Sequence, residues 1–235
     1  MTDFLRRYER DGSAPSFAQW RSDLGRRALL PALGLWALIV AVGLVIMHPL
    51  EGFPQELAVN LAFEDARTET MNQITSFWSN IGATFFIIAA CAVATALIWW
   101  RTKEWWFAVV PAIAISVQSA VFVSSAFVVG RSRPDVEHLD ESPPTSGFPS
   151  GHTGASTAFY LAMAMMAYRI SNPVLRYAAM ALCLLVPLLV AYARLYRGMH
   201  HLSDVIVGLL NGIACAFLAW RYLRRQDRTP SATPA

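Results

Sequence analysis

Residues 194–204 have the types and spacing of side chains that carry out phosphoryl transfer. His200 follows Arg194 by six residues and precedes Asp204 by four. If a helix begins near His200, this spacing places the Asp204 carboxylate on the same face as the imidazole. A carboxylate that binds one ring nitrogen fixes the tautomer and leaves the other nitrogen free to attack phosphorus. The pattern therefore predicts a nucleophile, His200, that is oriented by Asp204.

A second set of candidates lies at residues 149–152, which read Pro-Ser-Gly-His and open a long apolar run. The N-terminus of a helix offers unpaired N–H groups and the positive end of the helix dipole. Ser150 and Gly151 are therefore predicted to hold a phosphate group, and the glycine lets the anion approach the backbone closely. His152 would then lie beside the bound phosphate.

Phosphoryl transfer needs cations for the phosphate oxygens, an in-line nucleophile and an acid for the leaving group. We assign the cations to Arg133 and Arg194, the nucleophile to His200 and the acid to His152. This scheme needs no metal ion and no other cofactor, and the sequence near these residues lacks the carboxylate cluster of a two-metal phosphatase. Because each fragment alone is common by chance, the prediction depends on their combination.

The elements that must position these residues are membrane-spanning helices. Of the 235 residues, 55% are hydrophobic and 15% are charged, and the mean hydropathy is +0.40, which excludes an ordinary soluble domain. A span needs roughly 20 apolar residues. Six runs of this kind, bounded by charges, Pro or Gly, are residues 28–48, 78–100, 105–129, 151–170, 174–193 and 203–222.

These runs predict an all-α, polytopic membrane protein with about six transmembrane helices. One bundle would occupy residues 28–223, between a cytoplasmic N-terminal segment, 1–27, and a cytoplasmic tail, 224–235. The first run resembles a signal peptide, but its leader is long and no small-x-small cleavage site follows it, so we interpret it as a retained anchor. The basic residues lie beside the spans, which favours membrane topology over nucleic-acid binding.

The three cysteines fall inside predicted spans and have no C-x-x-C spacing, so we expect neither disulfides nor a zinc site. They are interpreted as packing residues.

The positions of lysine and arginine predict the orientation of the bundle, because cytoplasmic loops are enriched in both. Six spans place fourteen basic residues on one side and five on the other. The fourteen are Arg6, Arg7, Arg10, Arg21, Arg26, Arg27, Arg101, Lys103, Arg169, Arg176, Arg221, Arg224, Arg225 and Arg228. The five are Arg67, Arg131, Arg133, Arg194 and Arg197. Both termini are therefore predicted to be cytoplasmic, with segments 49–77, 130–150 and 194–202 outside.

Four of the five outward arginines lie in only two short loops, which topology does not require, so we interpret them as anion-binding residues. Segment 49–77 mixes apolar and charged residues and is predicted to lie as a helix on the membrane surface. His138 lies in an acidic loop that we expect to be solvated and not catalytic. A structural role is expected for His201, which would point about 100° away from His200 on a helix.

Arg133-Pro134, the Pro-Ser-Gly-His run at 149–152 and Arg194-x5-His200-x3-Asp204 resemble the three-part signature of the type 2 phosphatidic acid phosphatase superfamily. That superfamily includes bacterial undecaprenyl-diphosphate phosphatases. The resemblance covers about residues 126–208, and the six-span layout extends it. It implies His200 as nucleophile, His152 as general acid and later base, and Asp204 as the residue that orients His200. It also implies a phosphate site built from Arg133, Arg194, Ser150 and Gly151, and catalysis without metal.

One position departs from the family pattern. The first motif of the family usually begins with a lysine seven residues before the Arg-Pro pair, and here that position is Ala126. We hypothesise that Arg131, two residues from Arg133 in the same loop, supplies the missing cation. Arg197 is the alternative.

The predicted activity is hydrolysis of a membrane lipid phosphate or diphosphate, at the non-cytoplasmic face of the cell (inner) membrane. The resemblance favours undecaprenyl diphosphate as substrate, with phosphatidic acid and phosphatidylglycerol phosphate as alternatives. Two other functions stay open: a phosphotransferase that passes the phosphoryl group to an acceptor lipid, and a non-catalytic lipid-phosphate binder or transporter. The binder is disfavoured because binding alone would not need His152, His200 and Asp204 together.

Overall fold

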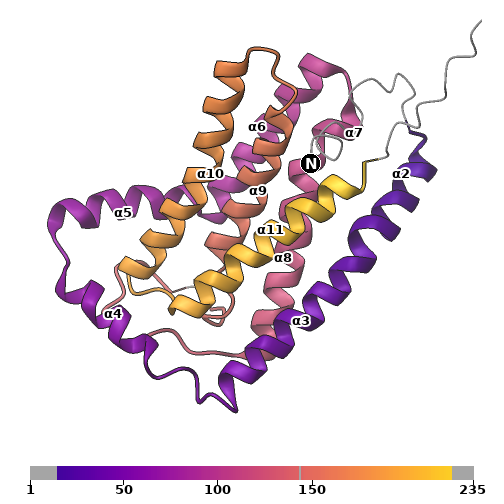
Figure 1. The fold of residues 1–235 in the computed structure, drawn as a ribbon. Coiled ribbons are helices and arrows are strands. Elements are labelled where there is room, and N and C mark those ends of the chain that lie inside the picture. Colours follow the sequence, from indigo (N-terminus) through magenta and orange to yellow (C-terminus); the bar gives the residue numbers. More distant parts are fainter. Residues whose placement is uncertain (1–14, 143, 224–235) are drawn as a thin grey trace, which may run out of the picture.

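The computed structural model describes residues 15–142 and 144–223, and every regular element in these ranges is a helix (Figure 1). The chain begins with α2 (Phe17–Leu24), a π-helical turn η1 (Gly25–Leu29) and α3 (Leu30–Met47), which follow one another without a break. The remaining helices are α4 (Glu56–Asp65), α5 (Glu69–Ile81), α6 (Thr84–Thr102), α7 (Trp105–Ala108), α8 (Val110–Val129), α9 (Gly151–Ala167), α10 (Pro173–Tyr196) and α11 (Leu202–Arg221). The prediction of an all-α fold is confirmed.

Five segments are long and apolar enough to cross a membrane: Phe17–Met47, Thr84–Thr102, Trp105–Val129, Pro173–Tyr196 and Leu202–Arg221. Each coincides with a predicted span, although the first helix begins eleven residues earlier than expected. The one remaining predicted span, residues 151–170, corresponds to α9, whose 17 residues are at the short end of what can cross a bilayer. It packs against α8, α10 and α11 and so completes the bundle.

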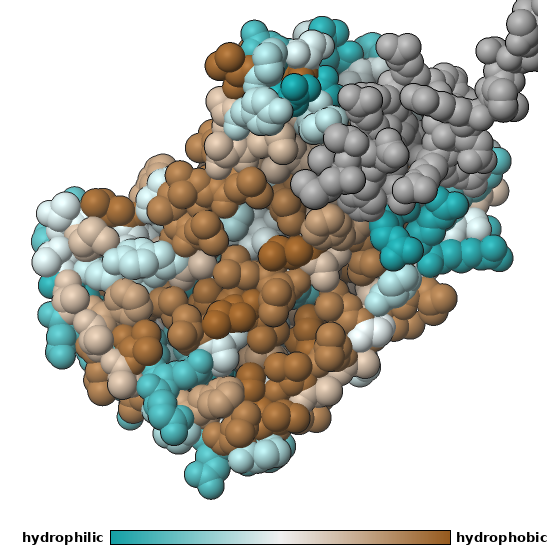
Figure 2. All heavy atoms as spheres, in the orientation of Figure 1, coloured by the Kyte–Doolittle hydropathy of each residue, from teal (hydrophilic) through white to brown (hydrophobic). Residues whose placement is uncertain are grey.

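The outer surface of the bundle is apolar, as a lipid environment requires. Figure 2 shows hydrophobic residues over the broad middle of the molecule and hydrophilic residues mainly towards its ends. The side chains of Phe85 on α6 and Phe127 on α8 are 89% and 90% exposed. An apolar surface of this extent is stable only against lipid.

The helix ends follow local sequence signals. Helix α8 stops at Gly130, whose φ of 65° is a left-handed conformation that favours glycine. The Asn172 side chain accepts hydrogen bonds from the Val174 and Leu175 N–H groups at 2.9 and 3.2 Å, and Pro173 takes the first position of α10.

Glycines bring α9 and α11 into close contact. A Cβ atom added at Gly208 would lie 2.7 Å from the Ser150 carbonyl oxygen, and one at Gly212 would lie 2.5 Å from the Gly154 carbonyl oxygen. Small residues at membrane helix crossings let backbones approach in this way. The Ser150 N–H consequently donates a hydrogen bond of 2.9 Å to the Asp204 carbonyl oxygen, so the first turns of α9 and α11 are side by side.

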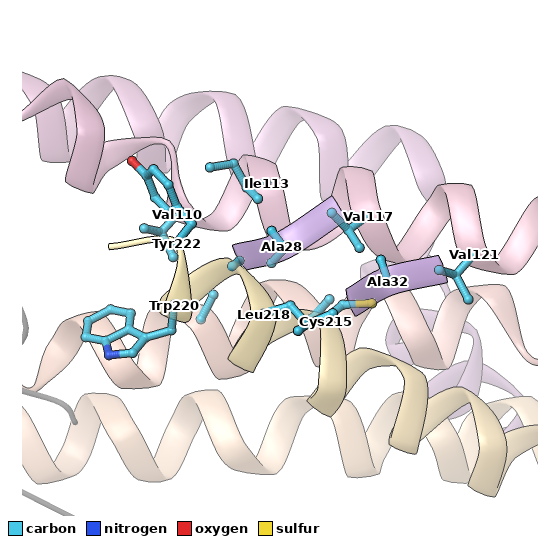
Figure 3. Close-up of a cluster of buried hydrophobic side chains, with 14 of the residues drawn as sticks. Ala28, Ala32, Val110, Ile113, Val117, Val121, Cys215, Leu218, Trp220 and Tyr222 are labelled. Carbon is cyan, nitrogen blue, oxygen red and sulfur yellow. The ribbon is translucent and has the colours of Figure 1, made fainter. Parts of the chain in front are cut away.

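The main core lies between η1–α3, α8 and α11, where Ala28, Val117, Cys215 and Trp220 are buried (Figure 3). The cysteines are free in the structure, with Cys91 and Cys215 buried.

Segment 49–77 was predicted to be one surface helix that precedes a span from residue 78. The structure instead has two helices, α4 and α5, and α5 runs on to Ile81, so the span that follows begins only at Thr84. The Thr68 hydroxyl accepts a hydrogen bond from the Met71 N–H at 3.3 Å. This N-cap starts α5 and so separates it from α4. Helix α5 lies across the bundle (Figure 1), as a helix on the membrane surface would. Predictions for residues 1–14 and 224–235 lie outside the described residues.

Candidate active site

Five of the eight predicted site residues line one cavity of about 300 Å³. They are Arg133, Gly151, His152, Arg194 and His200. These residues come from the start of α9, the end of α10 and the loops that precede α9 and α11, and Figure 1 shows that α9 and α11 begin at the end of the bundle where α10 ends. The structure therefore brings together residues that are up to 67 positions apart in the sequence.

His152 lies in the first turn of α9. The preceding residue must be small, because a Cβ atom at Gly151 would lie 2.7 Å from the ring of Phe122. Among the described residues, the His152 ring has no hydrogen-bond partner. Its nitrogens are therefore available to a substrate in the cavity.

His200 lies in the turn between α10 and α11, and its side chain is almost fully buried. Its Nδ1 is 2.7 Å from the Gly147 carbonyl oxygen and 4.0 Å from Asp204 Oδ2. Because a carbonyl oxygen only accepts, Nδ1 must carry the proton, and the lone pair is then on Nε2. The partner that fixes the tautomer is thus the backbone of Gly147, and the carboxylate of Asp204 stands further away.

The helix that carries Asp204 begins at Leu202, two residues after His200. The His201 N–H donates to Asp204 Oδ2 at 2.8 Å, so this carboxylate caps the helix instead of bonding the imidazole. His200 therefore lies just before this helix and not within it, and its side chain is a neighbour of Asp204.

Burial, followed by the positive charges of Arg194 and Arg133, holds the pKa of His200 well below its ordinary value of 6.5. The imidazole is therefore neutral at neutral pH, which is the state that a nucleophile needs.

Arg194 is held by an acidic residue that sequence reasoning missed. Its Nη1 donates to Asp140 Oδ2 at 2.6 Å and to Ser79 Oγ at 2.7 Å. Arg197 Nε donates to the other Asp140 oxygen at 2.8 Å. The expectation that the acidic loop at 135–141 is solvated is therefore wrong for Asp140, because its carboxylate joins two arginines.

Burial alone would raise the pKa of Asp140, but the hydrogen bond from Arg197, the charge of Arg194 and the hydrogen bond from Ser79 outweigh it and lower the pKa. Arg194 Nε is buried and has no hydrogen-bond partner among the described residues. Asp140 thus fixes one part of the Arg194 guanidinium and leaves another part for a ligand.

Arg133 reaches the cavity from the loop after α8, and its Nη1 donates to the Met199 carbonyl oxygen at 2.7 Å. Arg131, in the same loop, does not line the cavity. Its Nη1 lies 2.6 Å from Asp204 Oδ1, and its Nη2 lies 3.0 Å from Glu56 Oε2. The two arginines therefore have different contacts: Arg133 lines the cavity that holds the histidines, and Arg131 binds Asp204 and Glu56.

Ser150 is also placed apart from the cavity. Its hydroxyl donates to Thr153 Oγ1 at 2.9 Å, and its N–H donates to the backbone carbonyl oxygen of Asp204. Neither group is therefore free to donate to a phosphate. His138 lies outside the cavity too, with Nε2 3.0 Å from the Pro134 carbonyl oxygen.

The deeper part of the cavity is apolar and reaches the lipid-facing surface. Its walls come from α6 and α8, and two lining residues, Ile88 and Val123, are 55% and 54% exposed on the outside of the bundle. A lipid tail could therefore extend from the charged end of the cavity between α6 and α8 into the bilayer. The described part of the chain contains no group of three or more His, Cys, Asp or Glu side chains that could hold a metal ion.

Comparison with known proteins gives the family of the chain. The family model of the PAP2 superfamily matches residues 103–228, more than half of the chain, and the protein therefore belongs to that superfamily of membrane phosphatases. No curated protein shows a significant match.

Two solved structures have the same fold. One is a transmembrane PAP2-type phosphatidylglycerolphosphate phosphatase from Bacillus subtilis, with a TM-score of 0.70 and 20% identity, covering 80% of this chain and 93% of that one. The other is LpxE from Aquifex aeolicus, with a TM-score of 0.54 and 22% identity, covering 69% of this chain and 93% of that one. At these identities the likeness concerns the fold alone.

Proposed function

We propose that the protein is a metal-independent phosphohydrolase of a membrane lipid phosphate or diphosphate that works through a phosphohistidine intermediate. The observation that carries this proposal is the shared cavity of His152, His200, Arg133 and Arg194. It combines a neutral nucleophile, an unbonded acid–base group and two guanidinium groups at one end of an apolar channel.

In the first step, His200 Nε2 attacks the phosphorus atom and the bond from phosphorus to the leaving oxygen breaks. His152, which takes up a proton when the phosphate anion binds beside it, gives that proton to the leaving oxygen, and the Gly147 carbonyl retains the Nδ1 proton of His200. Arg133 and Arg194 offset the charge on the phosphoryl oxygens, and the first N–H groups of α9 add positive potential.

In the second step, His152 takes a proton from water, and the resulting hydroxide attacks the phosphohistidine. The P–N bond breaks, inorganic phosphate leaves and His200 returns to its neutral form. The same histidine thus acts first as acid and then as base.

Undecaprenyl diphosphate is the substrate that the motif resemblance favours, and it heads the panel to be tested. Phosphatidic acid and phosphatidylglycerol phosphate complete the panel. The second is chosen because one structural neighbour is described as a phosphatase of that lipid.

The test is phosphate release by the detergent-purified protein from each lipid, with EDTA present, and with His200→Ala as control. We expect release from at least one lipid and none from the variant. Full activity in His200→Ala would refute the mechanism. Tight lipid binding without release would favour a binding protein, and transfer of labelled phosphate to an added lipid alcohol would favour a phosphotransferase.

For the orientation, we propose that both termini are cytoplasmic and that the cavity faces the opposite side of the inner membrane. The distribution of basic residues supports this, and the start of α2 and the end of α11 lie at the same end of the bundle (Figure 1). Single cysteines in place of Glu137 and Lys103 in a cysteine-free background provide the test. A membrane-impermeant maleimide should label only the Glu137→Cys protein in intact cells, and the reverse pattern would invert the topology.

A further inference from the structure

We propose that Glu56, Asn60 and Arg131 are positioning residues that set the places of His200 and Asp204 from outside the cavity. We call these three residues the positioning network. The inference rests on the proposed phosphohydrolase function and gives Arg131 a role other than phosphate binding.

Arg131 is the centre of the network, and its side chain is only 2% exposed. Its Nη1 donates to Asp204 Oδ1 at 2.6 Å and to Ser203 Oγ at 2.7 Å. Its Nη2 donates to Glu56 Oε2 at 3.0 Å and to the Gly52 carbonyl oxygen. One guanidinium thus lies between two carboxylates, and its geometry ties the start of α4 to the start of α11.

Glu56 binds the first turn of α11 directly. Its Oε1 accepts the Ser203 N–H at 2.7 Å, and its Oε2 accepts the Ser203 hydroxyl at 2.8 Å. The first N–H groups of a helix have no partner within the helix and favour a negative charge. Glu56 therefore caps the helix that carries Asp204, although it is 148 residues away from Asp204 in the sequence.

Asn60 holds the nucleophile itself. It lies one turn after Glu56 on α4, on the same face, and it is 1% exposed. Its Nδ2 donates to the His200 carbonyl oxygen at 3.1 Å. Two residues of one surface helix therefore contact both ends of the segment from His200 to Asp204.

This arrangement determines what Asp204 can do. Arg131 binds one of its oxygens and the His201 N–H binds the other, so the carboxylate is held 4.0 Å from His200 Nδ1. At that distance it offers negative charge to the ring as the ring takes up the phosphoryl group. The Gly147 carbonyl can then keep the proton. Without Arg131, the buried Asp204 would lose its counter-charge and its fixed orientation.

The consequence is kinetic, because none of the three residues lines the cavity. Their loss should slow phosphoryl transfer to His200 and leave substrate affinity nearly unchanged. A displacement of about 1 Å at a reacting group can cost on the order of 100-fold in rate.

The experiment compares Arg131→Ala, Arg131→Lys, Glu56→Gln and Asn60→Ala by steady-state kinetics and by the single-turnover rate of phosphoenzyme formation. Glu64→Gln is the matched control, since Glu64 lies on the same helix but contacts Arg67 and the Glu137 N–H instead of α11. We expect kcat to fall roughly 100-fold in Arg131→Ala and roughly 10-fold in Glu56→Gln and Asn60→Ala, with KM within about threefold. Arg131→Lys should recover part of the loss, and Glu64→Gln should match the wild type.

A higher KM with unchanged kcat in Arg131→Ala would overturn the inference and make Arg131 a phosphate ligand. Wild-type kinetics in Glu56→Gln and Asn60→Ala would also overturn it, and these two variants decide the matter if Arg131→Ala does not fold. An active wild-type protein with unaffected variants would refute only the positioning network. No phosphate release by the wild-type protein from any lipid would refute the proposed function as well.

Discussion

The two cavity histidines are held in opposite ways. His200 lies in a turn outside the helices, with its ring bonded to Gly147 and its carbonyl bonded to Asn60. His152 lies within the first turn of α9, and its ring has no hydrogen-bond partner among the residues described. One ring is fixed by polar contacts, and the other is placed by its helix alone.

This difference matches the two chemical tasks. A nucleophile must present one nitrogen in one direction, which the bond from Nδ1 to the Gly147 carbonyl ensures. A residue that acts first as acid and then as base must exchange partners between the leaving oxygen and water, and a permanent hydrogen bond to the protein would hinder that exchange. In the described part of the chain, polar contacts hold the ring of His200 but not that of His152, and this difference supports the two proposed roles.

The first prediction tests the two proposed roles of these histidines by changing the leaving group of the substrate. His200→Ala should lower phosphate release by about 10³-fold or more from any substrate, because no other group forms the intermediate. In the first step, formation of the phosphoenzyme, His152→Ala should cost about 10²- to 10⁴-fold with a lipid alkoxide but much less with a nitrophenyl phosphate, whose leaving group needs no proton.

Single-turnover release of the leaving alcohol from a lipid phosphate, and of nitrophenolate from p-nitrophenyl phosphate, measures this first step without the hydrolysis step, in which His152 is the base. His138→Ala, a histidine outside the cavity, is the control and should keep wild-type rates on both. Equal losses on the two substrates in His152→Ala would remove the assignment of His152 as the acid.

The second prediction concerns Arg194, whose guanidinium serves both Asp140 and the cavity. Arg194→Lys should lower kcat/KM roughly 100-fold, since an ammonium group cannot bind a carboxylate and a phosphoryl group in the same fork. Steady-state kinetics on the best lipid of the panel gives the measurement. Arg101→Lys, at an exposed position on α6, should be unaffected. Unchanged kinetics in Arg194→Lys would mean that Arg194 holds the loop that carries Asp140 and does not bind the substrate.

The third prediction concerns Asp140 and is smaller. Asp140→Asn should lower the free energy of unfolding in detergent by about 1–3 kcal/mol at neutral pH, because two arginines lose a charged acceptor. The folded-state pKa of Asp140 lies below its ordinary value of 3.8. Its contribution to stability is therefore fully present above pH 3.8 and is lost as the pH falls through the lower folded-state value.

Unfolding measured from pH 7 downward should show the wild type and Asp140→Asn converging only below about pH 4. Asp135→Asn, in the exposed part of the same loop, should change stability by less than about 0.5 kcal/mol. A difference between the wild type and Asp140→Asn that stays constant with pH would show that the carboxylate charge is not what stabilises the loop.

The sequence predicted the spans well, because apolar length is a local signal, and the structure places both predicted histidines in one cavity. Five of the predicted spans coincide with helices that can cross a membrane, and α9 takes the place of the sixth. The contacts that orient the site were not predictable. Gly147 acts through its backbone carbonyl, which no residue type reveals, and Glu56 reaches Arg131 across 75 positions.

Arg131 and Arg133 illustrate the same limit at short range. They are two residues apart in one loop, yet one binds Asp204 and the other lines the cavity. Arg131 donates to Glu56 at the start of α4, whereas Arg133 donates to the Met199 carbonyl oxygen. The sequence shows that two arginines lie in this loop, but it does not show which groups their side chains contact.

The central claim, a covalent intermediate on His200, is tested most directly by trapping it. The protein is mixed for a single turnover with a lipid carrying ³²P in its terminal phosphate, quenched in alkali, where phosphohistidine survives, and digested for peptide mapping. We predict label on His200 in the wild type and none in His200→Ala. Phosphate release with no labelled protein, or label that persists in His200→Ala, would contradict the mechanism.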